Sequence, residues 1–486
     1  MKPNIVYILF DDLGYGDVSA LNEQSAFKTP AFDRIASQGV SFTDAHATSA
    51  VCTPSRYSII TGRYNWRSRL KSSVLGGFSS PLIEAHTPTV AQLLKRCGYA
   101  THLVGKWHLG LGLSKGSDFV EGEDFSDSAP IDYTQRIEGG PVDLGFDTFY
   151  GIAASLDMPP YAYIEDDHFT CVPTTTTRGE GMGFWRSGVT APDFVHQEVL
   201  DTLARRAVHV IEGRDRRPFF LFLSLTGPHT PILPAKEFQG RSKTNAYGDF
   251  VLHCDSVVDT ILETLRKEGI EDETLLIMTS DNGCSPQADF EALARCGHNP
   301  SYHFRGMKSD IYEGGHRVPL LMRWPGRIPA SRVCTHLVSL ADLYASLADI
   351  LDCPLGEQEG VDSVSIRSLM EDPDSDAVRS HLVSQSIDGS LSLRRGRFKL
   401  EMCPGSGGWS YPRSGSADEE GLPDLQLYDL ESDIGETTNI QHLYPDIVDS
   451  MREELATVVR RGRSTEGPPL ANDGVAIWQR AAWLGD

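Results

Sequence analysis

The sequence of 486 residues has no apolar stretch close to the roughly 20 residues that a membrane-spanning helix needs. The N-terminal residues also lack the pattern of a secretory leader, because the chain enters an apolar segment at Ile5 with no basic segment or cleavage site before it. These absences predict a cytoplasmic protein without a membrane partner. A periplasmic or secreted protein whose leader has been removed is the alternative.

Paired cysteine spacing is absent as well. The nine cysteines are scattered, and neither a CxxC pair nor a Cys/His finger occurs, which argues against a zinc knuckle. An odd, dispersed set in a chain of this length predicts reduced thiols, which again favours the cytoplasm. The sequence also lacks an internal repeat and a GxGxxG motif after its first strand, which argues against dinucleotide binding.

Positive charge is scarce. The chain has 44 Lys and Arg against 67 Asp and Glu, and its formal net charge is −23. Such a balance argues against nucleic acid or an anionic membrane as partner. An anionic substrate would therefore need a local concentration of cations at its site.

The length exceeds what one hydrophobic core usually absorbs, so two domains are expected. Helical and strand-like segments alternate as far as Ile350, which predicts an α/β domain with a mostly parallel sheet flanked by helices. The composition loosens between Gly356 and Asp376. We therefore expect a large domain over residues 1–375 and a smaller C-terminal α+β subdomain with a short antiparallel sheet over 376–486. Residues 115–185 carry little regular signal and are interpreted as an insertion with long loops.

A short segment, Val51-Cys52-Thr53-Pro54-Ser55-Arg56, combines a nucleophile with a fixed cation. Pro54 suits the first turn of a helix, and Gly62 suits its end. Cys52 would then lie where free backbone N–H groups and the helix dipole favour an anion, with Arg56 one turn away. A buried structural cysteine at a helix start is the alternative.

Polar clusters directly follow four predicted strands: Asp11-Asp12, Lys106-Trp107-His108, His229 and Asp281-Asn282. In open α/β sheets ligands bind at the carboxyl ends of strands, so these segments are expected to converge on one crevice. The carboxylate and amide oxygens form a set typical of Ca²⁺ or Mg²⁺ rather than zinc. Taken singly, each acidic pair could instead be a helix cap or a turn.

Cations accompany these carboxylates. Lys106, His108, His229 and Lys308 supply the positive charges and proton donors that an anionic ester requires. Lys308 lies in a segment rich in positive and hydrogen-bonding groups, residues 302–317, despite the acidic whole. The local cation requirement is therefore met.

Together these motifs resemble the type I, formylglycine-dependent sulfatase family, in particular its arylsulfatase A-like and N-acetylgalactosamine sulfatase-like members. Cys52-Thr53-Pro54-Ser55-Arg56 followed by Thr61-Gly62-Arg63 matches the family signature C-x-P-S-R with T-G-R. The resemblance continues through the later motifs to Leu427-Tyr428-Asp429-Leu430 and covers essentially the whole chain. It implies an alkaline-phosphatase-like fold and the hydrolysis of sulfate monoesters.

The resemblance also implies residue roles. A separate maturation enzyme would oxidise Cys52 to Cα-formylglycine, whose hydrate would attack sulfur with help from Arg56. His229 and Lys308 would bind the sulfate and protonate the leaving alcohol, Lys106 would neutralise sulfate charge, and His108 would take the second hydroxyl's proton. One Ca²⁺ would be held by Asp11, Asp12, Cys52, Asp281 and Asn282.

The subgroup resemblance suggests sulfated galactose or N-acetylgalactosamine at the end of a chain as the substrate. Loop position and chemistry select six candidate sugar contacts: Asp157, Tyr161, Trp185, His298, His303 and Arg305. The sulfate position, the linkage and the oligomeric state are not encoded in any pattern of the sequence.

Three alternatives stand beside this hypothesis. One is a phosphate mono- or diesterase of the alkaline phosphatase superfamily, which commonly has Thr or Ser at the Cys52 position and two zinc ions. The second is a sulfatase that acts on aryl or alkyl sulfates. The third is a non-enzymatic sulfoglycan-binding protein with an unmodified Cys52.

Overall fold

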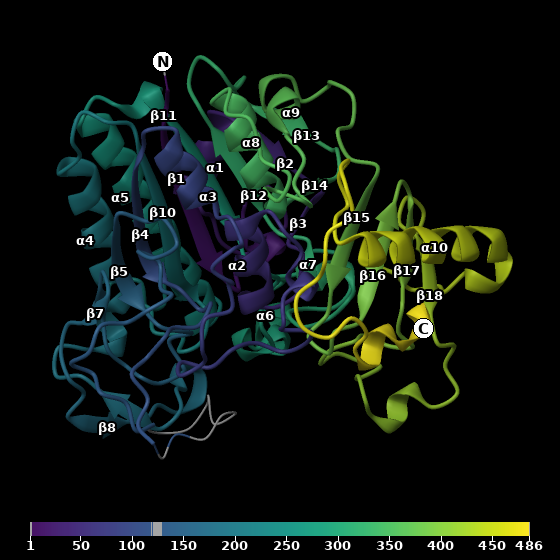
Figure 1. Ribbon diagram of the computed structural model, residues 1–486, viewed down its shortest axis with the longest axis horizontal. Coiled ribbons are helices and arrows are strands. Elements are labelled where there is room, and N and C mark those ends of the chain that lie inside the picture. The colour runs from purple at the N-terminus through teal and green to yellow at the C-terminus, as the bar shows by residue number, and fades with distance from the viewer. Residues whose placement is uncertain (1, 118, 120–128, 486) are drawn as a thin grey trace.

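The computed structural model describes residues 2–117, 119 and 129–485. A ten-stranded sheet with helices on both faces forms the larger part, and a four-stranded antiparallel sheet forms a second lobe beside it (Figure 1). The mostly parallel α/β domain and the C-terminal antiparallel sheet expected from the sequence are confirmed. Within the described residues no helix is both long enough and apolar enough to span a membrane.

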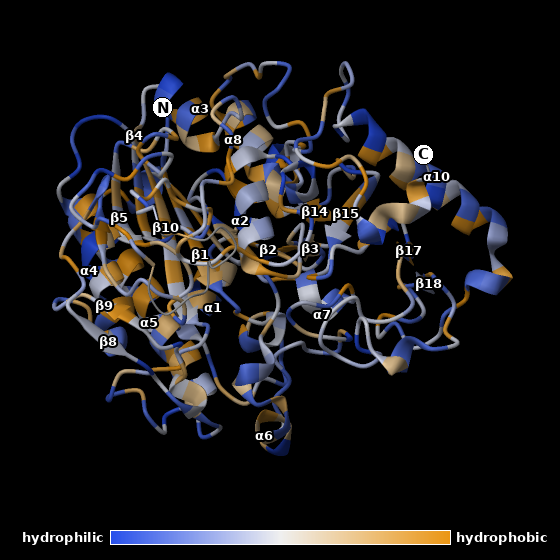
Figure 2. Cartoon of the chain, turned by 60° about the horizontal axis from the view of Figure 1, so that its bottom comes forward, coloured by the Kyte–Doolittle hydropathy of each residue, from blue (hydrophilic) through white to orange (hydrophobic). Residues whose placement is uncertain are grey.

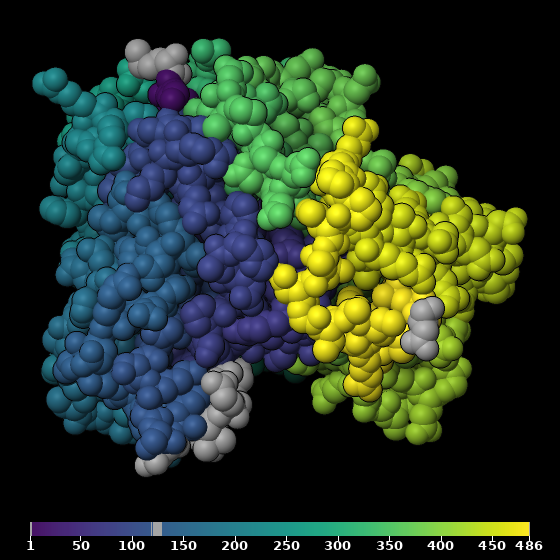
Figure 3. All heavy atoms as spheres, in the orientation of Figure 1, coloured from purple at the N-terminus to yellow at the C-terminus, as the bar shows by residue number. Residues whose placement is uncertain are grey.

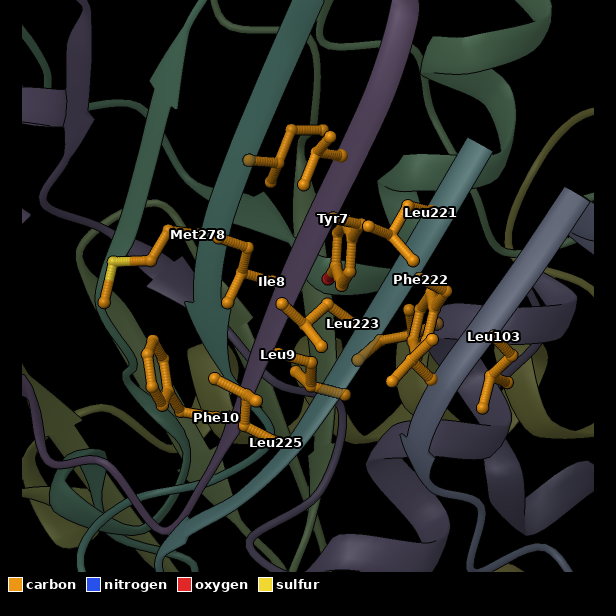
Figure 4. Packing of buried hydrophobic residues seen from close by; sticks show 14 of the residues in the cluster. Tyr7, Ile8, Leu9, Phe10, Leu103, Leu221, Phe222, Leu223, Leu225 and Met278 are labelled. Atoms are coloured by element: carbon orange, nitrogen blue, oxygen red, sulfur yellow. The ribbon is translucent and has the colours of Figure 1, made fainter. Parts of the chain in front are cut away.

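The centre of the large sheet consists of four parallel strands: β1 (Asn4–Asp11), β4 (Ala100–Lys106), β10 (Phe219–Pro228) and β11 (Thr274–Ser280). β1 lies between β10 and β11, with Tyr7 opposite Phe222 on one side and Ile277 on the other. Every residue of β1, β10 and β11 is buried, which explains their nearly continuous apolar sequences. Figure 4 shows the side chains of these strands packed between the layers, including the stacked rings of Tyr7 and Phe222.

The sheet is extended on both sides by shorter strands. Beside β11 lie β12 (Leu320–Arg323), β2 (Val40–Phe42) and β13 (Arg332–Cys334), and beside β4 lie β5 (Thr148–Ile152), β6 (Ile164–Glu165) and β7 (His168–Phe169). β12 runs antiparallel to β11, and β5 runs parallel to β4. Residues 115–185 are thus not only an insertion of loops, because three of their short strands complete one side of the sheet.

Two groups of helices cover the sheet (Figure 1). On one face α1 (Pro30–Ser37), α4 (Val199–Glu212) and α5 (Ala246–Lys267) pack together, and on the other α2 (Cys52–Thr61), α3 (Val90–Arg96) and α8 (Leu343–Ile350) do so. Figure 2 shows the hydrophobic colour concentrated on the central strands and on the helix faces turned toward them. The apolar spacing of α4 in the sequence reflects this arrangement, since its buried positions recur every three to four residues.

The second lobe is built from β15 (His381–Gln385), β16 (Leu391–Arg395), β17 (Phe398–Glu401) and β18 (Gln426–Asp429), with α10 (Pro445–Arg461) packed against β16 and β17. The chain that follows α10 returns to the large domain, where the Asp473 N–H donates to the Arg67 carbonyl over 2.6 Å. In Figure 3 this yellow segment lies against the purple and blue surface of the early chain.

The remaining strands and α-helices are short and connect or cap the layers. They are β3 (Ala45–His46), β8 (Thr175–Thr177), β9 (Gly188–Thr190), β14 (Val338–Ser339), α6 (Phe290–Arg295), α7 (Glu313–His316) and α9 (Arg367–Glu371).

Candidate active site

The carboxyl ends of the central strands bring the predicted polar clusters together. Asp11 is the last residue of β1, Lys106 the last of β4, and Asp281 follows β11 directly. β1 and β10 are in register such that Asp11 lies opposite Pro228, the residue before His229. One edge of the parallel sheet therefore carries all four clusters, as expected for this class of fold.

Asp12 leaves β1 in a left-handed conformation, with φ of 64°, which turns its carboxylate toward the neighbouring loops. The Lys308 ammonium lies 2.6 Å from Asp12 Oδ1, and Asn282 Nδ2 donates to the same oxygen over 2.7 Å. His229 Nε2 is 3.6 Å from Asp12 Oδ2. Asp12 is thus contacted by groups from three distant segments.

Cys52 is the first residue of α2, and Val51 before it is extended and offers no side-chain cap. The free N–H groups of the first helical turn therefore surround the thiol position. Cys52 is buried, and its Sγ lies 3.5 Å from both Asp11 Oδ1 and Lys308 Nζ. Gly62 ends the helix with φ of 63°, as its position in the sequence predicts.

Arg56 lies one turn after Cys52 and points into the same centre. Its Nε donates to Asp281 Oδ2 over 2.9 Å, and a second guanidinium nitrogen donates to Ser224 Oγ over 2.5 Å. The pair is buried, so the guanidinium holds the carboxylate in one orientation. Arg56 thereby links the start of α2 to the end of β11.

Lys106 fixes Asp11 from β4. Its ammonium donates to Asp11 Oδ2 over 2.7 Å and to Ser155 Oγ over 2.6 Å. Burial raises the pKa of Asp11, but His229, Lys106 and Arg56 outweigh it and hold that pKa well below its ordinary value. Asp11 is therefore ionised throughout the neutral range.

His229 and Lys308 are buried and positively charged. Burial lowers the pKa of His229, yet Asp11, Asp12 and the hydrogen bond with Cys52 together outweigh it and raise the pKa to about 9. For Lys308 the effect of burial is likewise overcome, by Asp12 and Cys52, and its pKa lies well above the ordinary value. Two fixed cations therefore face the Cys52 thiol position and can bind an oxyanion.

His108, unlike His229 and Lys308, is uncharged. Its backbone is left-handed, with φ of 60°, and its Nε2 donates to the Leu75 carbonyl over 2.8 Å. This bond leaves the lone pair on Nδ1, which is buried and has no hydrogen-bond partner. Burial and the neighbouring Lys106 lower the pKa of His108 well below its ordinary value. His108 is thus a neutral imidazole with a free proton acceptor.

The donor set suits a hard cation. Ligand atoms of Asp11, Asp12, Cys52 and His229 all lie within 4.8 Å of one another. Asn282 Oδ1 is buried and accepts no hydrogen bond, which leaves one further oxygen ligand unused. Carboxylate and amide oxygens at this density match the preferences of Ca²⁺ or Mg²⁺.

A cavity of about 300 Å³ opens onto this centre. Cys52, His108, His229 and Lys308 form its floor together with parts of several loops. The other lining residues are Val51, Ser73, Val74, Ser155, Asp157, Met158, Phe184, Arg186, Thr230, Ser285, Gln287, Ile387 and Trp409. The large domain and the C-terminal lobe both contribute, since Ile387 and Trp409 come from the latter.

Of the six candidate sugar contacts, the structure places only Asp157 in the cavity lining. Tyr161 lies behind the wall, where its buried hydroxyl donates to the carbonyls of Asp157 and Arg186. The Trp185 ring stacks on His196 at a centroid distance of 4.0 Å. Tyr161 and Trp185 therefore contribute to the packing of the insertion rather than to the cavity lining.

The other three candidates lie elsewhere for similar reasons. The buried His298 is bonded to Asp17 through Nε2 over 2.8 Å. The His303 ring contacts the Tyr302 ring at a tilt of 39°, and Arg305 donates to the Glu436 carbonyl at the junction with the C-terminal lobe. None of the three belongs to the lining of this cavity, because polar loop chemistry alone does not distinguish a packed side chain from an exposed one.

Sequence reasoning missed several lining residues, including Ser155, Arg186, Gln287 and Trp409. Ser155 follows β5, a strand that was not predicted, so nothing marked its proximity to Lys106. Arg186 forms an ion pair with Asp157. Trp409 belongs to no motif of the sequence, and only the docking of the C-terminal lobe brings it to the cavity.

With this geometry in view, the chain belongs to the sulfatase family: the sequence model of that family, described as Sulfatase, matches residues 3–353. It is therefore a sulfuric ester hydrolase. The chain is similar to the N-acetylgalactosamine-6-O-sulfatase of Bacteroides thetaiotaomicron, at 32% identity over 505 residues that cover 95% of this chain and 94% of the relative. It is 30% identical to human arylsulfatase A, over 90% of this chain and 83% of the relative.

Solved structures of sulfatases have the same fold as this chain. A sulfatase from Bacteroides thetaiotaomicron, described with the metabolism of multiple glycosaminoglycans, superposes with a TM-score of 0.81 at 31% identity and covers 94% of this chain and 99% of its own. A sulfatase from Pseudoalteromonas superposes with a TM-score of 0.71 at 22% identity, over 96% and 92% of the two chains, and supports the fold alone.

Proposed function

We propose that this sulfatase removes O-sulfate from the terminal sugar of a carbohydrate chain, with galactose or N-acetylgalactosamine as the sulfated unit. The observation that carries this proposal is the group of buried cations around Cys52 at the floor of the cavity. The similarity to an N-acetylgalactosamine-6-O-sulfatase, which extends over nearly both chains, supports the choice of sugar.

Asp11, Asp12, Asp281, Asn282 and the side chain of residue 52 would hold one Ca²⁺, which would supply positive charge beside the nucleophile and the sulfate oxygens. The unpartnered Asn282 Oδ1 supports this assignment. A maturation enzyme would convert Cys52 to Cα-formylglycine, which would supply a hydrated aldehyde as the nucleophile toward sulfur. Mass spectrometry of the peptide that contains residue 52 tests the conversion.

The protein's own cations position the ester. Lys308 and His229 would bind the sulfate oxygens, since both are protonated in the buried site. His229 is charged and carries a proton that it can give to the leaving alcohol. Lys106 would balance the charge that moves onto the sulfate oxygens, and Arg56 would hold Asp281 and favour an anion at residue 52.

His108 would act as the base of the second half of the reaction. Its Nδ1 has no hydrogen-bond partner, and His108 lines the same cavity as residue 52. Because the Leu75 carbonyl fixes the proton on Nε2, the lone pair on Nδ1 is kept available. The role assigned here is to accept a proton from the hydroxyl that remains on residue 52.

The cavity favours one sugar ring rather than the interior of a chain. Its volume of about 300 Å³ is at the small end for ligand pockets. Asp157 is buried, and its Oδ1 has no hydrogen-bond partner, while Oδ2 is paired with Arg186. An unpaired acceptor in the wall suits a sugar hydroxyl, which can donate to it.

A panel of substrates tests the proposal. We expect sulfate release from N-acetylgalactosamine 6-sulfate, N-acetylgalactosamine 4-sulfate or galactose 6-sulfate, with kcat/KM above that for 4-nitrophenyl sulfate. Activity on aryl or alkyl sulfates but on no sugar would contradict the carbohydrate assignment. A preference of several orders of magnitude for 4-nitrophenyl phosphate would favour a phosphatase, and an intact thiol at Cys52 after native expression would favour a binding protein.

A further inference from the structure

Trp409 is unlike the other six tryptophans of the chain, all of which belong to the described residues. Trp409 is exposed, at 39% of the residue's surface, whereas Trp66 and Trp107 are almost completely buried. No ring stacking or cation–ring contact involves Trp409 among the described residues. A large apolar ring is thus left uncovered at the cavity that contains the Cys52 site.

The backbone beneath this ring is held rigidly. The Trp409 N–H donates to Asp310 Oδ1 over 2.9 Å and to Ser309 Oγ over 3.0 Å. Ser410 donates to the same carboxylate through its N–H, over 3.1 Å, and through its hydroxyl, over 2.5 Å. Ser309 and Asp310 are the two residues that follow Lys308, so the sulfate-binding segment itself positions the ring.

Gly408 allows this close docking. A Cβ at residue 408 would lie 2.5 Å from Asp310 Oδ1 and 2.6 Å from the Ser309 backbone, so any other residue would push the loop away. The Ile311 N–H also donates to the Ser406 carbonyl over 2.7 Å. The loop that carries Trp409 is therefore fitted to the Lys308 segment on both sides of the ring.

The cavity wall has an aromatic part and a polar part. Phe184, at 42% exposure, is a second exposed aromatic side chain in the lining, and it comes from the insertion. Asp157 and Arg186 supply the polar part. Flat apolar faces beside the unpartnered Asp157 Oδ1 match a pyranose, which has an apolar C–H face and polar hydroxyl edges.

We infer that Trp409 is the stacking platform for the sugar ring that carries the sulfate ester, an inference that rests on the proposed function. The indole ring contacts the C–H face of the pyranose, and Asp157 accepts a hydrogen bond from a hydroxyl at the edge of the sugar. The C-terminal lobe thereby contributes a substrate-binding residue and sets the orientation of the sugar relative to Lys308.

The test compares Trp409→Ala with Trp409→Phe and with Tyr411→Ala. Tyr411 lies in the same loop, is 73% exposed and does not line the cavity, so it is the matched control. With N-acetylgalactosamine 6-sulfate, or the best sugar of the panel, we expect Trp409→Ala to raise KM about tenfold with little change in kcat. Trp409→Phe should stay within about threefold of the wild type, and Tyr411→Ala should be unchanged.

A binding measurement makes the test independent of turnover. In a Cys52→Ala background, calorimetric titration with the same sugar sulfate should give a dissociation constant about tenfold weaker for Trp409→Ala. An unchanged KM and an unchanged dissociation constant, in a wild type that is active on the sugar, would overturn this inference alone. A greater loss on 4-nitrophenyl sulfate than on the sugar would also overturn it, because the ring would then serve an aryl group. A wild type inactive on every sugar would instead refute the proposed function.

Discussion

Two buried clusters of charge lie at the two ends of one segment, residues 308–313, and they differ in their surroundings. At one end Lys308 contacts Asp12 beside Cys52. At the other end Glu313 contacts Lys399, whose ammonium also lies 2.7 Å from Glu436. Both clusters consist of charged groups that are almost completely inaccessible to solvent.

The cluster at Lys399 is closed. Its ammonium is surrounded by Glu313 at 3.1 Å, Glu401 at 3.2 Å and Glu436 at 2.7 Å, and it donates to the Ile311 carbonyl over 2.8 Å. None of these residues is found in the lining of the Cys52 cavity. The closed cluster joins the two parts of the molecule, since Glu313 comes from the large domain and Lys399, Glu401 and Glu436 come from the C-terminal lobe.

The cluster at Lys308 is open. It faces the cavity, and it leaves His108 Nδ1 and Asn282 Oδ1 without hydrogen-bond partners. Buried charge alone therefore does not identify a functional site in this protein. Unpartnered atoms alone do not identify it either, since Glu313 Oε1 and Glu401 Oε1 of the closed cluster also lack hydrogen-bond partners. The two clusters differ in access, because Cys52, His108 and Lys308 line a cavity and the residues around Lys399 do not.

The largest expected effect is on activity. Cys52→Ala should reduce sulfate release at least about 10³-fold, because the group that carries the nucleophile is removed. The rate is measured on the best substrate of the panel, alongside the midpoint of thermal unfolding. Cys254→Ala is the matched control, since Cys254 is equally buried but lies in α5, outside the cavity. Full activity of Cys52→Ala would place the nucleophile elsewhere.

A substitution in the closed cluster should lower the free energy of unfolding rather than the activity. Lys399→Met removes the cation that three buried acidic side chains surround, and loss of one partner of a buried ion pair costs about 3–5 kcal/mol. Urea unfolding measures the free energy of unfolding. Lys236→Met, at an exposed position, should leave it nearly unchanged. A loss no greater for Lys399→Met than for this control would show that Lys399 does not balance the cluster.

A cation should bind to only one of the two clusters. After treatment with a chelator, Ca²⁺ at one hundred times its dissociation constant should raise the free energy of unfolding of the wild type by about 2.7 kcal/mol. Asp281→Asn should reduce this increase, because it weakens a carboxylate of the open cluster. Glu401→Gln should retain it. An equal response of both variants would contradict the assignment of the open cluster as the metal site.

The contrast also shows what a sequence can predict. Strand ends and the spacing from Cys52 to Arg56 are local features, so they predicted the sheet, α2 and the group of residues that converges at Asp11. The closed cluster and Trp409 depend on how two lobes dock, and no local pattern encodes that. His298 and Arg305 were selected as sugar contacts for their chemistry, but packing against Asp17 and Glu436 occupies them.

The smallest effect is expected in the pH dependence of the closed cluster. Burial, with Glu436 nearby, raises the pKa of Glu401 well above its ordinary value, although Lys399 opposes the shift. A carboxyl whose pKa is raised by folding contributes stability that is complete below its unfolded pKa and is lost as the pH rises through the folded pKa. The free energy of unfolding of the wild type should therefore fall, through this group, as the pH rises above about 4.5.

Glu401→Gln should flatten this part of the profile, because the amide stays neutral and can still donate a hydrogen bond to Glu436. Urea unfolding at several pH values measures the free energy of unfolding of both proteins. As the pH rises, this free energy should fall less for the variant than for the wild type. Glu431→Gln, at a side chain that is 68% exposed, is the control and should follow the wild type. If Glu401→Gln also followed the wild type, the proton in the closed cluster would reside on a different carboxylate. The two clusters would still differ in their access to the cavity, but a carboxyl group other than Glu401 would carry the proton of the closed cluster.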